Sequence, residues 1–145
     1  MENDFGSWQE FEEYTRNILE KFRFEVEFRK VFKDPERKYE IDVIGRGKQF
    51  IICIDCKFYK NKGRVNALRK EAKKHIEKVH RLKDLEDENK DYIPLIITSL
   101  DDSMLIENSC LFIPHFKLNN FLNNIHIYLD KLNYSGSDDE FQRAN

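Results

Sequence analysis

Two periods run through the hydrophobic positions of the chain, one typical of helices and one typical of strands. Apolar side chains recur at helical spacing over residues 8–22 and again over residues 64–85, which predicts two amphipathic helices. Residues 22–32 and 39–45 instead alternate between polar and apolar side chains, as half-exposed strands do. Residues 49–60, QFIICIDCKFYK, begin as a continuous apolar run, the pattern of a strand that is buried on both faces.

The second half of the chain predicts further elements that complete an α/β fold. Residues 92–99 form an apolar fourth strand, a short helix begins near Ser99, residues 110–114 form a fifth strand, and residues 118–132 form a closing helix. The turn GRGK joins the second and third strands in a tight hairpin. The order of elements, α-β-β-β-α-β-α-β-α, predicts a mixed β-sheet flanked by helices.

Composition limits the class of protein. The 145 residues suit one domain, which we place at residues 1–134, followed by a flexible acidic tail at residues 135–145. A hydrophobic content of 40% with twelve Phe excludes disorder for most of the length. No apolar run is long enough to span a membrane, and the first ten residues lack the features of a signal peptide. We therefore expect an intracellular protein with no membrane partner.

Cysteine and histidine side chains do not predict a metal site. Cys53 and Cys56 are three residues apart on a strand and face opposite sides, so we interpret them as core residues. The histidines are interpreted as structural or surface residues, because no carboxylate or cysteine is spaced to complete a site with them. They are His75, His80, His115 and His126.

The third strand carries two opposite charges at the end of its apolar run. One face has only apolar side chains, whereas the other changes from Ile51 and Cys53 to Asp55 and Lys57. Because an unpaired buried charge is strongly destabilising, we expect this end of the strand to deliver both side chains to a cleft. The simpler alternative is a salt bridge between Asp55 and Lys57 at the strand end.

The hairpin supplies a second carboxylate. With Gly47–Lys48 as the two-residue loop, Asp42 lies opposite Cys53, on the face of Asp55 and about 7–8 Å from it on the diagonal. Two carboxylates at that separation repel each other unless a cation lies between them. Oxygen ligands of this kind favour Mg²⁺ or Mn²⁺ over zinc. Lys57, two residues beyond Asp55, could hold a water or a phosphate oxygen.

The charge of the chain is polarised although its formal total is only −2. The segment from Lys57 to Lys83 holds eleven Lys or Arg residues against two Glu, so it carries +9 and the rest of the chain −11. Such an imbalance favours a polyphosphate partner over an ordinary solvated helix face, which carries both signs in similar numbers. Candidate contacts with a phosphate backbone, chosen because they lie nearest the proposed cleft, are Lys60, Lys62, Arg64, Arg69, Lys70, Lys73 and Lys74.

The ordered set of a helical Glu, an Asp and a D-x-K tripeptide across a hairpin resembles the PD-(D/E)XK nuclease superfamily. The segments FEEYTRNILEKFRFEVEF and YEIDVIGRGKQFIICIDCKFYK, with the basic helix that follows, are most similar to Mrr-type restriction endonucleases and archaeal Holliday junction resolvases. The resemblance covers about residues 8–98, and CLFIPHFKLNNFL is similar to Mrr-type domains. It implies a restriction-endonuclease-like fold and a cytoplasmic protein of a prokaryotic or archaeal cell.

The resemblance also implies roles for the residues of the hairpin. Asp42 takes the place of the first acidic metal ligand, Asp55 that of the second, and Lys57 that of the catalytic lysine. The backbone carbonyl of Cys56 is implied as a further ligand. The ion would be Mg²⁺ or Mn²⁺, and no organic cofactor is implied.

A glutamate of the first helix completes the implied catalytic set. In these families it lies about three turns before the aromatic residue that opens the first strand, and counting back from Phe24 selects Glu12 rather than Glu13. Glu12 would bind the metal through water or would bind a second ion. The alternative interpretation is that Glu12 is an ordinary exposed glutamate of the helix. The chain departs from the families at Asp55, where Glu or Gln is usual, and at Arg23, where Gly is frequent.

We therefore expect a Mg²⁺-dependent endonuclease that hydrolyses DNA phosphodiester bonds, of restriction or of repair and recombination type. The substrate would be duplex or branched DNA, and cutting both strands of a duplex would require a homodimer. One alternative is a non-catalytic DNA-binding or assembly subunit with the same fold. Another is a protein-interaction domain whose basic helix binds an acidic partner.

Overall fold

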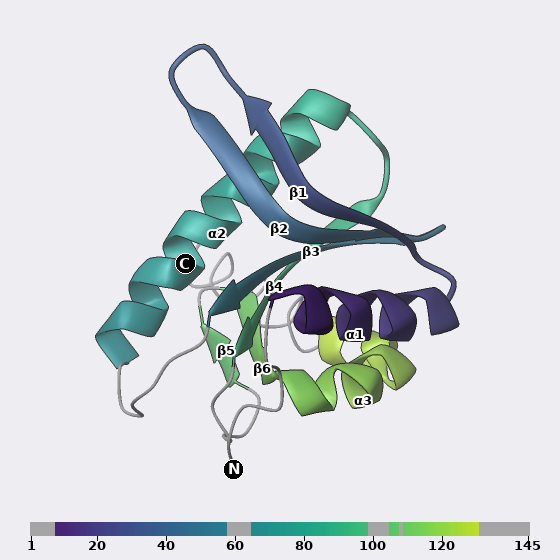
Figure 1. The fold of residues 1–145 in the computed structure, drawn as a ribbon. Helices are drawn as coiled ribbons and strands as arrows, with labels where there is room; N and C mark the ends of the chain where they lie inside the picture. Colours follow the sequence, from purple (N-terminus) through teal and green to yellow (C-terminus); the bar gives the residue numbers. More distant parts are fainter. Residues whose placement is uncertain (1–7, 58–64, 99–104, 108, 131–145) are drawn as a thin grey trace.

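The computed structural model describes residues 8–57, 65–98, 105–107 and 109–130 of the chain. These residues form an α/β fold in which a six-stranded mixed sheet is flanked by helices (Figure 1). The helices are α1 (Trp8–Lys21), α2 (Val65–Glu86), the 3-10 helix η1 (His115–Lys117) and α3 (Leu118–Asn123). The strands are β1 (Glu25–Lys33), β2 (Lys38–Arg46), β3 (Phe50–Lys57), β4 (Asp91–Thr98), β5 (Leu105–Glu107) and β6 (Cys110–Pro114).

The strands lie in the order β1-β2-β3-β4-β6-β5. Neighbours among β1, β2 and β3 are antiparallel, and α2 forms the crossover to β4, which runs parallel to β3 and β6. The short β5 pairs antiparallel with β6 at the far edge. The five predicted strands and the two long helices are thus confirmed, and β5 is a sixth strand that was not predicted.

The predicted closing helix is interrupted. α3 ends at Asn123, Asn124 adopts φ −125° and ψ 31°, and residues 125–130 are helical again. The side-chain amide of Asn124 donates to the carbonyl of Asn120 at 3.0 Å, a bond that competes with the helical pattern.

Some predicted features lie outside the described residues. They include the short helix near Ser99 and the tail at residues 135–145. Within the described residues, no helix is both long enough and apolar enough to cross a membrane.

Helices cover the sheet on both faces, with α1 and α3 together on one face and α2 on the other (Figure 1). On the first face, Phe11 of α1 and Phe121 of α3 belong to the same buried cluster as Ile54 of β3. On the second face, Val79 of α2 packs with Ile44 of β2. Apolar surface buried on both sides of the central strands explains their continuous hydrophobic runs.

The cysteines are core residues, as predicted for two of them. Cys53 packs on the α2 face and Cys56 on the α1–α3 face, and both are buried. Burial raises the pKa of both thiols and of the Cys110 thiol, so these cysteines are not reactive nucleophiles.

The alternation of faces in β2 breaks at Asp42. Tyr39 and Ile41 pack on the α2 face, whereas Val43 packs on the α1–α3 face, although residues two apart in a regular strand share a face. The alternation predicted for residues 39–45 would place all three side chains on one face, and this expectation is wrong for Val43. Across the ladder, opposite Asp42, Arg29 of β1 has a φ of 53°, in the left-handed region, so the two strands depart from regular geometry at the same level.

The same break redirects β1. Val26 and Phe28 pack against the α1–α3 face, whereas Phe32, beyond the break, belongs to the cluster on the α2 face. There Phe32 stacks on Tyr39 with 5.4 Å between ring centroids. The outer part of the β1–β2 hairpin therefore packs over α2 rather than over α1 (Figure 1).

α1 ends in a Schellman motif that requires a left-handed residue. The N–H of Phe24 donates to the carbonyl of Leu19 at 3.0 Å, and the N–H of Arg23 to that of Glu20 at 2.9 Å. Arg23 has a φ of 69°, a conformation that favours glycine. The helix therefore ends as it would with glycine at this position, at a cost in backbone strain.

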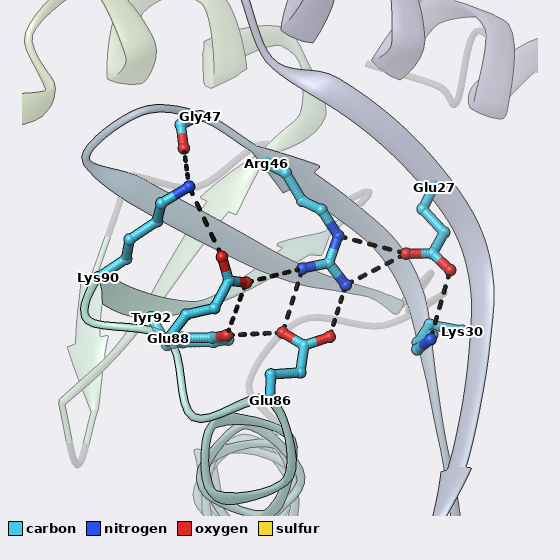
Figure 2. A network of polar contacts seen from close by, with 8 residues as sticks. All are labelled: Glu27, Lys30, Arg46, Gly47, Glu86, Glu88, Lys90 and Tyr92. Atoms are coloured by element: carbon cyan, nitrogen blue, oxygen red, sulfur yellow. Dashed lines mark hydrogen bonds and ion pairs between the residues drawn. The ribbon is translucent and has the colours of Figure 1, made fainter.

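A polar network fastens the hairpin end of β2 to the C-terminal end of α2 (Figure 2). Both terminal nitrogens of the Arg46 guanidinium contact Glu86, at 2.7 and 3.1 Å, and the same group contacts Glu27 of β1 at 3.2 Å. Glu88 lies 3.6 Å from Arg46, and the hydroxyl of Tyr92 donates to Glu86 at 2.6 Å. Side chains from β1, β2, α2 and β4 thus meet around one arginine.

Candidate active site where β2 and β3 separate

The β2–β3 hairpin places Asp42 across from Asp55. The ladder between the strands ends at the pair Val43 and Ile54, so Asp42 and Asp55 occupy the next positions in register. The two residues are therefore directly opposite each other in the register rather than on a diagonal.

The predicted register, with Asp42 opposite Cys53, is wrong by two residues. The N–H of Gly47 donates to the carbonyl of Phe50 at 2.8 Å, which makes Lys48 and Gln49 the residues of the loop. A shift of two residues does not by itself move a side chain to the other face, so the hydrophobic pattern could not detect it.

Beyond the last ladder pair, carboxylates join the two strands. The N–H of Asp42 donates to Oδ1 of Asp55 at 3.2 Å, and the N–H of Cys56 donates to Oδ2 of Asp42 at 2.9 Å. The space between β2 and β3 beyond the last ladder pair is called the gap below. Because the N–H and C=O of one strand residue point the same way, the carbonyl of Cys56 is also directed to the gap. The side chains of Asp42 and Asp55 and the backbone of Cys56 thus meet at the point where β2 and β3 separate.

Asp55 is buried against α2. Its side chain is 6% exposed, and its Oδ2 atom accepts a hydrogen bond from Nζ of Lys78. Nδ1 of His75 lies 3.3 Å from the same oxygen without a well-formed hydrogen bond, while Nε2 donates to the carbonyl of Cys53 at 2.8 Å. Two side chains of α2 therefore surround the charge of Asp55.

The two carboxylates differ in electrostatic state. Burial alone would raise the pKa of Asp55, but His75 and Lys78 outweigh it and hold that pKa well below its usual range. Burial and the neighbouring charge of Asp55 raise the pKa of Asp42, despite the N–H of Cys56 and the more distant Lys78 and Lys57. Negative charge at Asp42 is therefore incompletely compensated.

Asp42 also borders a hollow on the side of α1. The hollow has a volume of about 380 Å³ and is lined by Glu12, Arg29, Glu40, Asp42 and Val43. The carboxylate of Glu12, only 14% exposed, pairs with the guanidinium of Arg29. Glu13, the alternative helical glutamate, is exposed. Glu12 thus lies beside the same hollow as Asp42, and an arginine engages it.

The side chain of Lys57 lies on the same side of β3 as Asp55 but pairs with Glu71 rather than with Asp55. Its Nζ lies 3.3 Å from Glu71 of α2, and its side chain is 37% exposed. The alternative of a simple Asp55–Lys57 salt bridge does not describe the site, because Lys78 occupies that role.

The candidate phosphate contacts divide into two groups. Arg69, Lys70, Lys73 and Lys74 are exposed on α2. Lys60, Lys62 and Arg64 lie outside the described residues.

Sequence reasoning missed His75 and Lys78. The interpretation of all four histidines as structural or surface residues does not place His75 beside Asp55, where it is buried; His80 and His126 are exposed and His115 is buried. A signal was present, because His75 falls in the buried stripe of α2 between Ala72 and Val79. Lys78 follows one turn later.

The donor chemistry of the gap fits a hard divalent cation, with one condition. Asp42 has one oxygen oriented by Cys56 and borders the hollow, and carboxylate and carbonyl oxygens are the ligands that Mg²⁺ and Mn²⁺ prefer. Asp55 can offer both of its oxygens only if Lys78 leaves Oδ2. Accordingly, the described residues contain no ready cluster of three His, Cys, Asp or Glu side chains around one point.

Comparison with known proteins identifies a family. No model of a known protein family matches the chain. An uncharacterized protein of Archaeoglobus fulgidus is 38% identical over 128 residues, an alignment that covers 88% of this chain and 98% of the relative. The chain belongs to the family of this archaeal protein. The chain also aligns with the crystal structure of a protein of unknown function, AF1548, at a TM-score of 0.43 and 25% identity. That alignment covers 61% of this chain and 45% of AF1548, so this chain spans less than half of the length of AF1548.

Proposed function

We propose that the protein is a metal-dependent DNA endonuclease with a restriction-endonuclease-like fold. The observation that carries the proposal is the meeting of the Asp42 and Asp55 side chains with the Cys56 backbone where β2 and β3 separate. Lys57 follows on the same strand, and Glu12 borders the adjoining hollow. The raised pKa of Asp42 adds support, because it reports negative charge that a bound cation would compensate.

The residues of the site would then have distinct roles. Asp42 would hold the ion with an orientation fixed by the N–H of Cys56, and Asp55 would complete the carboxylate pair. Lys57 would turn from Glu71 to position the attacking water or the phosphate, and Glu12 would act through water or a second ion. When bound, the ion would lower the pKa of a water ligand and offset charge that develops on the phosphate.

The exposed basic side chains of α2 support DNA as the substrate. Contacts from lysine and arginine to phosphates position a duplex without reading its sequence, and they weaken as salt rises. The helix begins beyond the end of β3 that carries Asp55, so its first turns adjoin the site. Cleavage of both strands would require a second copy of the chain.

The test is cleavage of supercoiled plasmid and of branched DNA in Mg²⁺ or Mn²⁺, with a chelator as the blank. We expect the chain to cut with either ion and Asp42→Asn to lose cleavage while keeping salt-sensitive DNA binding. Glu20→Gln, an exposed carboxylate of α1, is the matched control and should cut as the parent does. Undiminished cleavage by Asp42→Asn, or loss of its DNA binding, would contradict the proposal.

A second candidate function is a DNA-binding or assembly subunit without catalysis. One observation favours it: Asp55 is almost fully buried and already paired with Lys78. This candidate predicts salt-sensitive DNA binding with no cleavage in either metal and no metal-dependent change in stability.

A further inference from the structure

Lys78 differs from its neighbours on α2. Of the Lys and Arg side chains of this helix whose exposure the structure describes, Lys78 alone is half-buried and the others are exposed. Its side chain is 20% exposed, and Nζ donates both to Oδ2 of Asp55 and, at 2.9 Å, to the carbonyl of Glu40. The ammonium therefore bridges β2 and β3 at the point where they separate.

One ammonium does not balance the charge of the gap. Lys78 contacts Asp55, while the pKa of Asp42 stays raised by burial and by the charge of Asp55, although Lys78 and Lys57 both act to lower it. His75 also faces Asp55 rather than Asp42. The gap thus contains a compensated carboxylate beside an undercompensated one.

A divalent ion bound by Oδ2 of Asp55 would compete with the Lys78 ammonium for that oxygen. A carboxylate oxygen that binds a metal ion directly would place that ion within about 4 Å of an ammonium on the same oxygen, where like charges repel strongly. The lysine stem has four rotatable carbons, so the ammonium can withdraw from Asp55 while α2 stays in place.

We propose that Lys78 is a built-in competitor for the cation of the Asp42–Asp55 pair, so that metal binds only as the ammonium leaves Asp55. This regulation rests on the proposed function in one respect, the use of Asp42 and Asp55 as cation ligands. In the metal-free site the ammonium compensates the charge of Asp55, and its competition sets the metal affinity below the value that the two carboxylates alone would give.

The test is calorimetric titration of Mn²⁺ into the full chain and two variants. Lys78→Met keeps the length of the side chain and removes its charge; Lys83→Met removes one charge from an exposed position of the same helix. We expect Lys78→Met to bind Mn²⁺ at least about tenfold more tightly than the parent, because the competing charge is absent. Lys83→Met should stay within about twofold. Equal or weaker Mn²⁺ binding by Lys78→Met would overturn the proposal.

A measurement on the parent chain does not depend on the variant folding. Acylation of lysine amines followed by peptide mass spectrometry should show Lys78 reacting faster when Mn²⁺ is added, with Lys83 unchanged. If the acylation rate of Lys78 stays the same at saturating Mn²⁺, the proposed competition is wrong. Cleavage of DNA without either effect would refute this inference and leave the nuclease proposal intact. Both effects without cleavage would refute the nuclease and leave the competition intact.

Discussion

At the scale of single residues, two facing carboxylates have opposite effects on stability. Burial disfavours the charged form of Asp55, but His75 and Lys78 favour it more strongly, so the charge of Asp55 stabilises the fold. Asp42 is charged at a position where burial and Asp55 both oppose that charge, so its ionised form destabilises the fold. A carboxylate kept at such a cost is typical of a functional site.

We therefore predict opposite changes from two equivalent substitutions. Asp42→Asn keeps an oxygen that can accept from Cys56 and removes the unfavourable charge, so the free energy of unfolding at neutral pH should stay equal or rise. Asp55→Asn leaves Lys78 without its partner and should lower that free energy by about 3 kcal/mol. Urea denaturation measures both, and a loss of similar size in the two variants would contradict the assignment of the charges.

The end of α1 offers a second prediction at this scale. Arg23 adopts a left-handed conformation that costs most residues about 1–2 kcal/mol and glycine almost nothing. After allowance for the greater freedom of glycine in the unfolded chain, Arg23→Gly should stabilise the protein by about 1 kcal/mol. Arg23→Ala keeps the Cβ atom and should give no such gain in thermal or urea unfolding. Equal stability of the two variants would show that the backbone at this position is not strained.

At the scale of elements, the hydrophobic pattern predicted the long helices and five strands because each buries one stripe or face with a regular period. It missed the register of the β2–β3 hairpin because a shift of two residues preserves the faces. It also missed the reversal of faces at Asp42, because nothing in the identity of Arg29 signals a left-handed backbone. β5 has three residues, too few to show a period.

The candidate site was likewise predicted only in part. Asp42, Asp55 and the Cys56 backbone meet because the D-x-K strand and its hairpin partner are local in sequence. The contribution of α2 was missed because His75 and Lys78 reach Asp55 only through the crossover that packs α2 on the sheet. Contacts between distant segments depend on packing, which a single helix pattern does not specify.

The network around Arg46 yields a prediction for the pH dependence of stability. Burial acts to raise the pKa of Glu86, but hydrogen bonds from Arg46 and Tyr92 outweigh it, so the pKa in the folded state lies below the ordinary value. A depressed pKa gives stability that is present above the unfolded pKa and is lost as pH falls through the folded pKa. Glu86→Gln should therefore cost about 1 kcal/mol at pH 7, after allowance for solvent screening, and much less at pH 3.

Chemical denaturation at the two pH values tests this. Glu36→Gln, in the exposed turn between β1 and β2, is the matched control and should change stability little at either pH. A Glu86→Gln cost that is the same at pH 3 and pH 7 would show that the ion pair does not stabilise the fold.

At the scale of the whole molecule, the two ends of the β2–β3 hairpin differ in character. Its turn end is held by the Arg46 network, which ties α2 and β4 to β1 and β2 (Figure 2). At its opposite end β2 and β3 separate, and carboxylates, a lysine and a histidine take the place of ladder bonds. A rigid end opposite a polar gap is an arrangement that can hold a ligand without moving the core.

The measurement that tests our central claim most directly is an anomalous difference map from crystals soaked in Mn²⁺. We predict a peak between the carboxylates of Asp42 and Asp55, near the Cys56 carbonyl, with the Lys78 ammonium withdrawn from Asp55. A map in which Mn²⁺ is absent from this gap at saturating concentration, while Lys78 still contacts Asp55, would contradict the assignment of the acidic pair as a metal site.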